Sequence, residues 1–125
     1  MAMPNVYQQY KSQSITTMTG GELLVMLYDE LIKDVKRAEL AIDAHKVDTA
    51  HSSLMHAQDI IGYLAETLDN QYEISDELSR LYQFFTGQLI QANISKDAEI
   101  LREVLPMLME LRDTWKQAEK LSRMR

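Results

Sequence analysis

Apolar residues recur every three or four positions in four successive stretches of this 125-residue chain. Such spacing places them on one side of an α-helix and leaves polar residues on the other. The stretches cover about residues 20–44, 47–69, 76–93 and 96–121, and short connections join them. Helices joined by short connections pack as antiparallel neighbours, because the chain has to reverse. The sequence therefore predicts an all-α fold, an antiparallel up-down four-helix bundle over residues 19–125, with an extended N-terminal tail over residues 1–18.

Residues suited to helix ends separate these stretches. Thr19 and Glu22 form a capping box before the first helix, and Ser75 and Ser95 are the predicted N-caps of the third and fourth helices. Pro106 lies inside the fourth stretch, where it removes a backbone N–H and presses on the preceding turn. We therefore expect a bend in the fourth helix, with the helix resuming after it.

Composition excludes several classes of function. The net charge is −6 and the 13 Lys and Arg residues are scattered along the chain, which argues against a nucleic-acid partner. The chain has no cysteine, so it forms neither disulfides nor zinc-thiolate sites. The first residues do not resemble a signal peptide, and no apolar run approaches the roughly 18 residues of a membrane span. We expect a soluble cytoplasmic protein that does not insert into membranes.

No residue pattern points to catalysis or to a metal. A di-iron site in a bundle needs Glu-x-x-His pairs, and none of the three histidines belongs to one. His51 and His56 are five residues apart and point away from each other on a helix, so surface or capping roles are expected. The sequence also lacks a Gly-x-Ser-x-Gly elbow and a Gly-rich phosphate loop. We predict that the protein is not an enzyme and needs no cofactor.

The helices carry more apolar residues than one core stripe requires, most clearly in a second seam on the fourth helix. A second seam indicates either a helix wedged between two neighbours or an exposed groove for an amphipathic partner helix. Self-association through the same seam, giving a weak homodimer, is the alternative. The candidate groove residues from three helices are Tyr63, Leu64, Phe85, Leu89, Ile100, Val104 and Met107.

The predicted tail is polar but keeps the apolar side chains of Tyr7, Tyr10 and Ile15. A polar tail rarely retains such residues unless they contact something. Two interpretations remain open: a tail packed permanently on the bundle, or a lid that a partner displaces from the groove. Both place these three residues among the candidate partner-binding positions.

Several ordered segments together resemble the FliS family, the flagellin-specific secretion chaperones of bacterial flagellar export. The likeness covers nearly the whole chain and does not depend on a single short motif. It departs at Gly20-Gly21, where the family usually has Ser-Pro, and at Glu30, where a glycine is common. The clearest matching segments are residues 5–10 (NVYQQY), 23–29 (LLVMLYD), 46–50 (KVDTA), 57–61 (AQDII), 89–93 (LIQAN) and 111–116 (LRDTWK).

The resemblance implies a helical bundle that binds the disordered C-terminal segment of flagellin in the cytoplasm. It further implies prevention of premature filament assembly and delivery to the flagellar type III export apparatus. By the same resemblance, Tyr7 and Tyr10 belong to an N-terminal cap that occupies the client groove. Whether an export gate component or other flagellar regulators share this surface stays open at the level of sequence.

Overall fold

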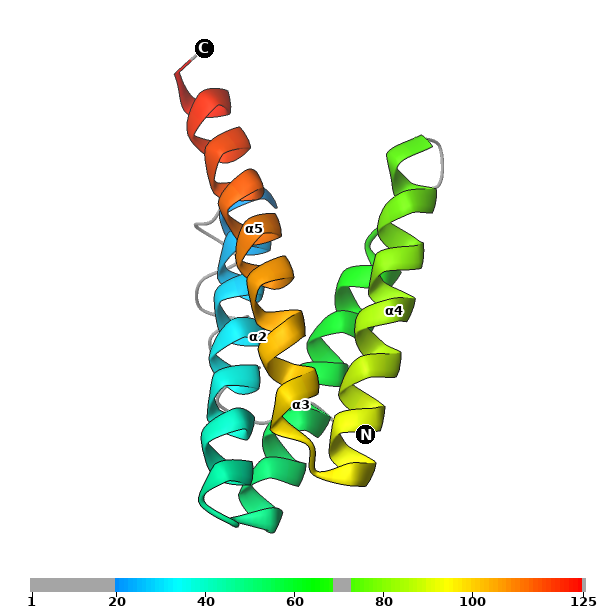
Figure 1. The fold of residues 1–125 in the computed structure, drawn as a ribbon. Coiled ribbons are helices and arrows are strands. Elements are labelled where there is room, and N and C mark those ends of the chain that lie inside the picture. Colours follow the sequence, from blue (N-terminus) through cyan, green and yellow to red (C-terminus); the bar gives the residue numbers. More distant parts are fainter. Residues whose placement is uncertain (1–19, 69–72, 125) are drawn as a thin grey trace.

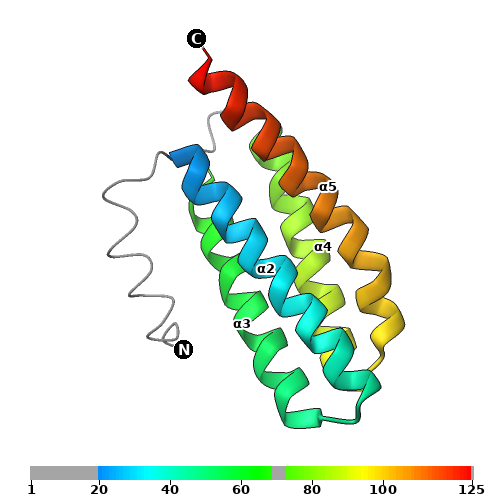
Figure 2. The same ribbon diagram turned by 90° about the vertical axis from the view of Figure 1, so that its left-hand side faces the viewer.

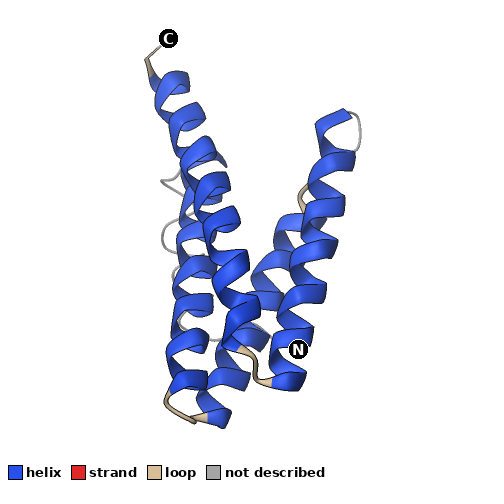
Figure 3. Ribbon diagram, viewed as in Figure 1, coloured by secondary structure: helices blue, strands red, loops and turns tan. Residues whose placement is uncertain are grey.

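The computed structural model describes residues 20–68 and 73–124, and nearly all of them are helical (Figure 3). The helices are α2 (Gly20–Asp43), α3 (Val47–Glu66), α4 (Glu73–Ser95) and α5 (Ala98–Arg123). The described residues contain no strand. The predicted all-α four-helix fold is thus confirmed. The predicted tail, with Tyr7, Tyr10 and Ile15, lies outside the described residues, as does Thr19 of the predicted capping box.

Successive helices run in opposite directions and enclose one core (Figure 1). The helix α2 packs against α3 and α5, and α4 also packs against α3 and α5. No Cα atom of α2 lies within 8 Å of one in α4, so these two helices are diagonal partners. Figure 2 shows the same bundle from the side on which α2 lies in front. The antiparallel up-down arrangement is the predicted one.

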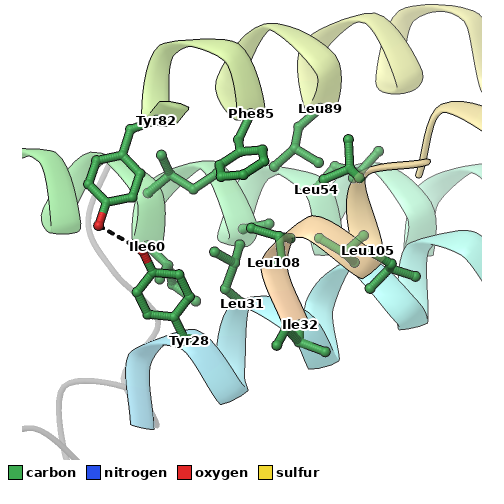
Figure 4. Packing of buried hydrophobic residues seen from close by; sticks show 14 of the residues in the cluster. Tyr28, Leu31, Ile32, Leu54, Ile60, Tyr82, Phe85, Leu89, Leu105 and Leu108 are labelled. Atoms are coloured by element: carbon green, nitrogen blue, oxygen red, sulfur yellow. Dashed lines mark hydrogen bonds between the residues drawn. The ribbon is translucent and has the colours of Figure 1, made fainter. Parts of the chain in front are cut away.

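The predicted stripes meet as the buried core (Figure 4). Complete burial of one Leu, Ile or Phe side chain contributes about 1.5–3 kcal/mol before the entropy lost on folding is counted. The largest fully enclosed side chains come from all four helices: Tyr28, Leu31, Val35, Leu54, Ile60, Ile61, Leu64, Phe85, Leu89, Leu101, Val104 and Leu108.

Two similar turns end the bundle on one side, which we call the closed end. After α2 and after α4 the chain passes through a left-handed residue, His45 with φ 58° and Lys96 with φ 51°. The following amide then donates back to the helix, from Lys46 to the Ala41 carbonyl at 2.7 Å and from Asp97 to the Ala92 carbonyl at 3.2 Å. This pattern satisfies carbonyl groups that the helix itself leaves free.

The predicted caps of α4 and α5 are wrong. The helix α4 already begins at Glu73, so Ser75 lies within its first turn and is only 4% exposed. Ser95 is the last residue of α4, and its hydroxyl donates to the Gln91 carbonyl at 2.8 Å. Asp97 caps α5 instead, accepting from the Glu99 amide at 3.0 Å. A serine hydroxyl can bond backward, as that of Ser95 does, as well as forward, so a serine alone does not locate a helix start.

The helix α5 packs along α2 and continues through Pro106. Arg102 pairs with Glu39 at 2.9 Å near the closed end, and Arg112 pairs with Asp29 at 2.8 Å farther along. Near the start of α2, a Cβ atom on Gly21 would come within 3.1 Å of the Glu119 side chain. These contacts hold the two helices together up to the opposite end of the bundle.

In contrast, α4 and α5 lie close at the turn that joins them and diverge toward the first turns of α4 (Figure 1). We call this side of the molecule the open end. Burial follows the divergence, because no residue of α5 after Leu108 is buried in the described part. Leu111 and Trp115 are only partly covered there, although both pack against the core.

Candidate functional site

Apolar side chains line the two helix flanks that border this divergence. Asn93 marks the α3 side of α4, because its amide bonds His51 of α3 at 2.9 Å. Phe84 is nine residues away from Asn93 and therefore lies on the opposite side of the helix. On α5, Arg102 and Arg112 mark the flank that faces α2. The opposite flank carries the seam Ile100, Met107 and Leu111.

We call this surface the α4–α5 face and define it by Leu81, Phe84, Ile100, Met107 and Leu111. Phe84 is 46% exposed and Met107 is 37% exposed, which is high for such large apolar side chains. The other three are half-buried and pack against the core. The face therefore leaves apolar area accessible in the folded bundle.

The predicted groove residues divide into exposed and buried sets. Ile100 and Met107 belong to the α4–α5 face. Phe85, Leu89 and Val104 lie beneath it and are at most 1% exposed. They form part of the core, so a partner would reach them only if α4 and α5 separated further. Both interpretations of the α5 seam therefore apply in part. Val104 is buried between neighbouring helices, whereas Met107 is exposed on the surface.

The two candidates on α3 are not brought to this face. Leu64 is a core residue with 1% exposure. His56 faces α2, where it bonds Asp34, and Tyr63 lies two helical turns beyond His56 on the same side of α3. Tyr63 is half-buried and packs against the core. The structure therefore separates Tyr63 from Ile100 and Met107.

A buried aromatic cluster lies next to the α4–α5 face. The hydroxyls of Tyr28 on α2 and Tyr82 on α4 are 2.7 Å apart, and both residues are at most 3% exposed (Figure 4). Burial raises the pKa of Tyr28, and the nearby polar groups of Tyr82 and Trp115 offset only part of that effect. Burial also raises the pKa of Tyr82, and its neighbour Tyr28 raises it further. Both hydroxyls are therefore neutral, and each needs a partner inside the bundle.

A second buried polar cluster joins α2 to α3. Asp34 is 2% exposed, and its carboxylate contacts the His56 ring and, at 3.4 Å, the Arg37 guanidinium. Burial raises the pKa of Asp34, while His56 and Arg37 favour its ionised form. The prediction of surface or capping roles for the histidines is wrong for His56. A polar residue between two apolar stripes gives no sequence signal that a neighbouring helix covers it.

Other features do not form a chemical site in the part of the chain that is described. Residues 20–68 and 73–124 contain no group of three His, Asp or Glu side chains placed to hold a metal ion. None of their helices is long and apolar enough to cross a membrane. A shallow hollow on the outward side of α5 is lined by Pro106, Met109, Glu110, Asp113, Thr114 and Gln117.

The structure is a four-helix bundle that exposes large apolar side chains on its α4–α5 face. Comparison with known proteins then gives the family. The family model described as "Flagellar protein FliS" matches residues 3–122. The chain therefore belongs to the FliS family of flagellar secretion chaperones.

Individual relatives agree with this assignment. The flagellar secretion chaperone FliS of Bacillus subtilis is 37% identical over 118 residues, covering 94% of this chain and 89% of the relative. The flagellar secretion chaperone FliS of Salmonella typhimurium is 31% identical over 115 residues, covering 89% and 85%. A crystal structure of a bacterial flagellar chaperone matches with a TM-score of 0.77 at 18% identity, covering 93% of this chain and 96% of that one. That structural likeness supports the fold.

Proposed function

We propose that this protein is an export chaperone that binds the disordered C-terminal segment of flagellin in the cytoplasm. Binding there would prevent premature polymerisation and aid delivery to the flagellar type III export apparatus. The observation that carries the proposal is the α4–α5 face: a member of a secretion-chaperone family exposes Phe84 and Met107 on neighbouring helices. An export gate component or other flagellar regulators are further candidate partners.

The face has the chemistry that an unfolded client requires. A segment kept unfolded for export exposes apolar positions that would otherwise associate with other copies. Such a segment can form an amphipathic helix on a partner and place residues at i, i+3, i+4 and i+7 against it. Ile100, Met107 and Leu111 follow the same spacing on α5. Met107 can adapt its flexible thioether to the client, and the cost of ordering the client moderates the affinity.

The proposal assigns different roles to the candidate residues. Met107 and Ile100 contact the client directly, together with Phe84, which is not among the site residues predicted from the sequence. Phe85, Leu89 and Val104 support the face from below. Tyr7, Tyr10 and Ile15 belong to a tail that covers the face until the client displaces it. Tyr63 and Leu64 lie elsewhere in the bundle.

Calorimetric titration with a C-terminal flagellin fragment tests the proposal. The wild-type protein should bind one fragment per chain, and removal of residues 1–18 should alter the affinity. Met107→Glu should weaken binding about tenfold or more, because a carboxylate would replace a side chain worth roughly 2 kcal/mol of apolar burial. Val104→Glu is unsuitable, because it would place a charge in the core.

Leu40→Glu is the matched control, because Leu40 is 68% exposed on α2 and lies outside the α4–α5 face. It should leave both the affinity and the helical content unchanged. Absence of binding heat at tens of micromolar would contradict the proposal. If the mass then rose with protein concentration and Met107→Glu abolished that rise, the face would instead serve a homodimer.

A further inference from the structure

The hydroxyl pair of Tyr28 and Tyr82 joins two helices whose backbones do not meet. The backbones of α2 and α4 lie diagonally across the bundle, beyond 8 Å at every Cα pair. The two tyrosine rings bridge this separation through the core, and their hydroxyls meet at 2.7 Å (Figure 4). The bond therefore ties the first half of α4 to α2 directly.

The first half of α4 is the wall of the α4–α5 face that diverges from α5 (Figure 1). Burial along α4 is complete at Phe85, Leu89 and Ala92, whereas Leu78 near its start is 7% exposed. Ile74, one turn before Leu78, is 55% exposed. The opposite wall, α5, is held to α2 by ion pairs. A change in the width of the face therefore requires movement of α4 away from α5 and α2.

Trp115 of α5 lies beside this hydroxyl pair. It packs against the core and interacts with the Tyr28 hydroxyl. Its indole Nε1 is shielded from solvent but makes no hydrogen bond of normal geometry to any described residue. Trp115 is also the single tryptophan of the chain, so its fluorescence reports on this position.

We infer that Tyr28 and Tyr82 are positioning residues whose hydrogen bond latches α4 in its closed position and opens when the α4–α5 face receives its client. This inference rests on the proposed function. A bond between two neutral hydroxyls suits such a role, because water or a polar client group can replace either partner. Its net contribution in a folded protein is small compared with that of a whole apolar contact.

The latch also explains how buried residues can assist binding. Phe85, Leu89 and Val104 are closed off in the present arrangement but border the point where α4 would move. Opening would add their surface to the α4–α5 face. Apparent affinity then depends on the fraction of molecules that are open, and weakening the latch raises that fraction.

The test compares wild type with Tyr82→Phe and Tyr28→Phe, which keep the rings and remove one hydroxyl each. Stopped-flow mixing with the C-terminal flagellin fragment should show association about 2- to 12-fold faster for each variant, the range that corresponds to one hydrogen bond. Acrylamide should quench Trp115 more strongly in the free variants than in wild type. The double variant should show less than the product of the two single effects, because both remove the same bond.

Ile61→Val is the matched control, because it removes one methylene from a core residue of α3 that is 1% exposed. It lowers stability by a comparable amount without touching the latch. Equal association rates and equal quenching in wild type, control and tyrosine variants would overturn the inference. If wild type fails to bind the fragment at all, the proposed function fails, and the quenching comparison alone then decides whether the latch exists.

Discussion

At the closed end of the bundle several small residues are buried around the two turns, whereas at the open end several large apolar side chains are only partly covered. Ala38, Ala41, Ala50, Ala92 and Ala98 are at most 6% exposed around the two turns. Small side chains let helix backbones approach closely and exclude water. At the open end the half-buried residues that pack against the core include Leu24, Met26, Leu68, Leu81, Leu111 and Trp115.

The same four helices thus divide two tasks along their length. The closed end supplies packing, paired turns and the contacts of Arg102 with carboxylates on two helices. At the open end, apolar side chains stay partly exposed in the folded protein. A protein that binds an unfolded client needs both ends. A bundle with all its apolar side chains buried has no apolar surface for a client, and a bundle with too few of them buried does not fold.

A matched pair of substitutions on α5 measures this difference most directly. Leu101 is 0% exposed, whereas Leu111 is half-buried in the diverging part. Leu101→Ala should lower the free energy of unfolding by about 2–5 kcal/mol, and Leu111→Ala by about 1 kcal/mol. Urea denaturation followed by circular dichroism gives both values. Equal losses would show that the open end is packed as tightly as the closed end.

The tyrosine latch predicts a pH dependence of the folded protein's stability. The pKa values of Tyr28 and Tyr82 are raised above 10.0, so the folded protein keeps protons that the unfolded chain releases. Their contribution to stability is complete below about pH 10 and is lost as pH rises above it, at up to about 1.4 kcal/mol per pH unit for each group.

Thermal unfolding measured between pH 9 and pH 11 tests this dependence. The melting temperature of the double variant Tyr28→Phe with Tyr82→Phe should fall less steeply with rising pH than that of wild type, because neither side chain can titrate. Parallel declines in the two proteins would mean that these hydroxyls ionise in the folded state as readily as in the unfolded one.

The α2–α3 contact should behave as a fixed part of the bundle. His56→Ala would leave the Asp34 carboxylate buried with Arg37 as its remaining ion-pair partner, at an expected cost of about 2 kcal/mol. Asp34→Asn combined with His56→Ala should recover part of that loss, since the buried charge is then gone. The denaturation midpoints of wild type, His56→Ala and the double variant test this expected order of stability. A larger loss in the double variant would contradict this role for the charge.

Glycine substitutions in the two closed-end turns should give the smallest of these effects on the free energy of unfolding. His45 has a positive φ, which costs an ordinary residue about 1 kcal/mol relative to glycine. His45→Gly should therefore raise the free energy of unfolding by up to about 1 kcal/mol. Lys96→Gly should gain less, because Lys96 also donates to the Asn93 carbonyl at 2.6 Å. A loss of stability in His45→Gly would show that its side chain contributes more than its backbone strain costs.

The bundle could be predicted from the sequence because each stripe reports which side of its helix is buried. Leu54, Phe85 and Leu101, which lie on the apolar stripes of their helices, are all fully buried. The helix ends were less predictable, since Ser75 and Ser95 can bond in several local geometries. Asp97 was the cap of α5, two residues after the predicted Ser95.

The candidate site could be predicted only in part, because a second apolar seam does not reveal how far two helices diverge. Val104 and Met107 belong to the same seam, yet one is 1% and the other 37% exposed. The contact between Tyr28 and Tyr82 depends on two helices 54 residues apart in sequence, and no local pattern encodes it. The burial of Asp34 has the same origin.

Hydrogen–deuterium exchange of the full chain, with and without the C-terminal flagellin fragment, tests the central claim most directly. If the α4–α5 face binds the client, the fragment should slow exchange in the first half of α4 and the second half of α5. The turns at His45 and Lys96 should exchange at unchanged rates. Slower exchange confined to the closed end would contradict the division of tasks between the two ends of the bundle.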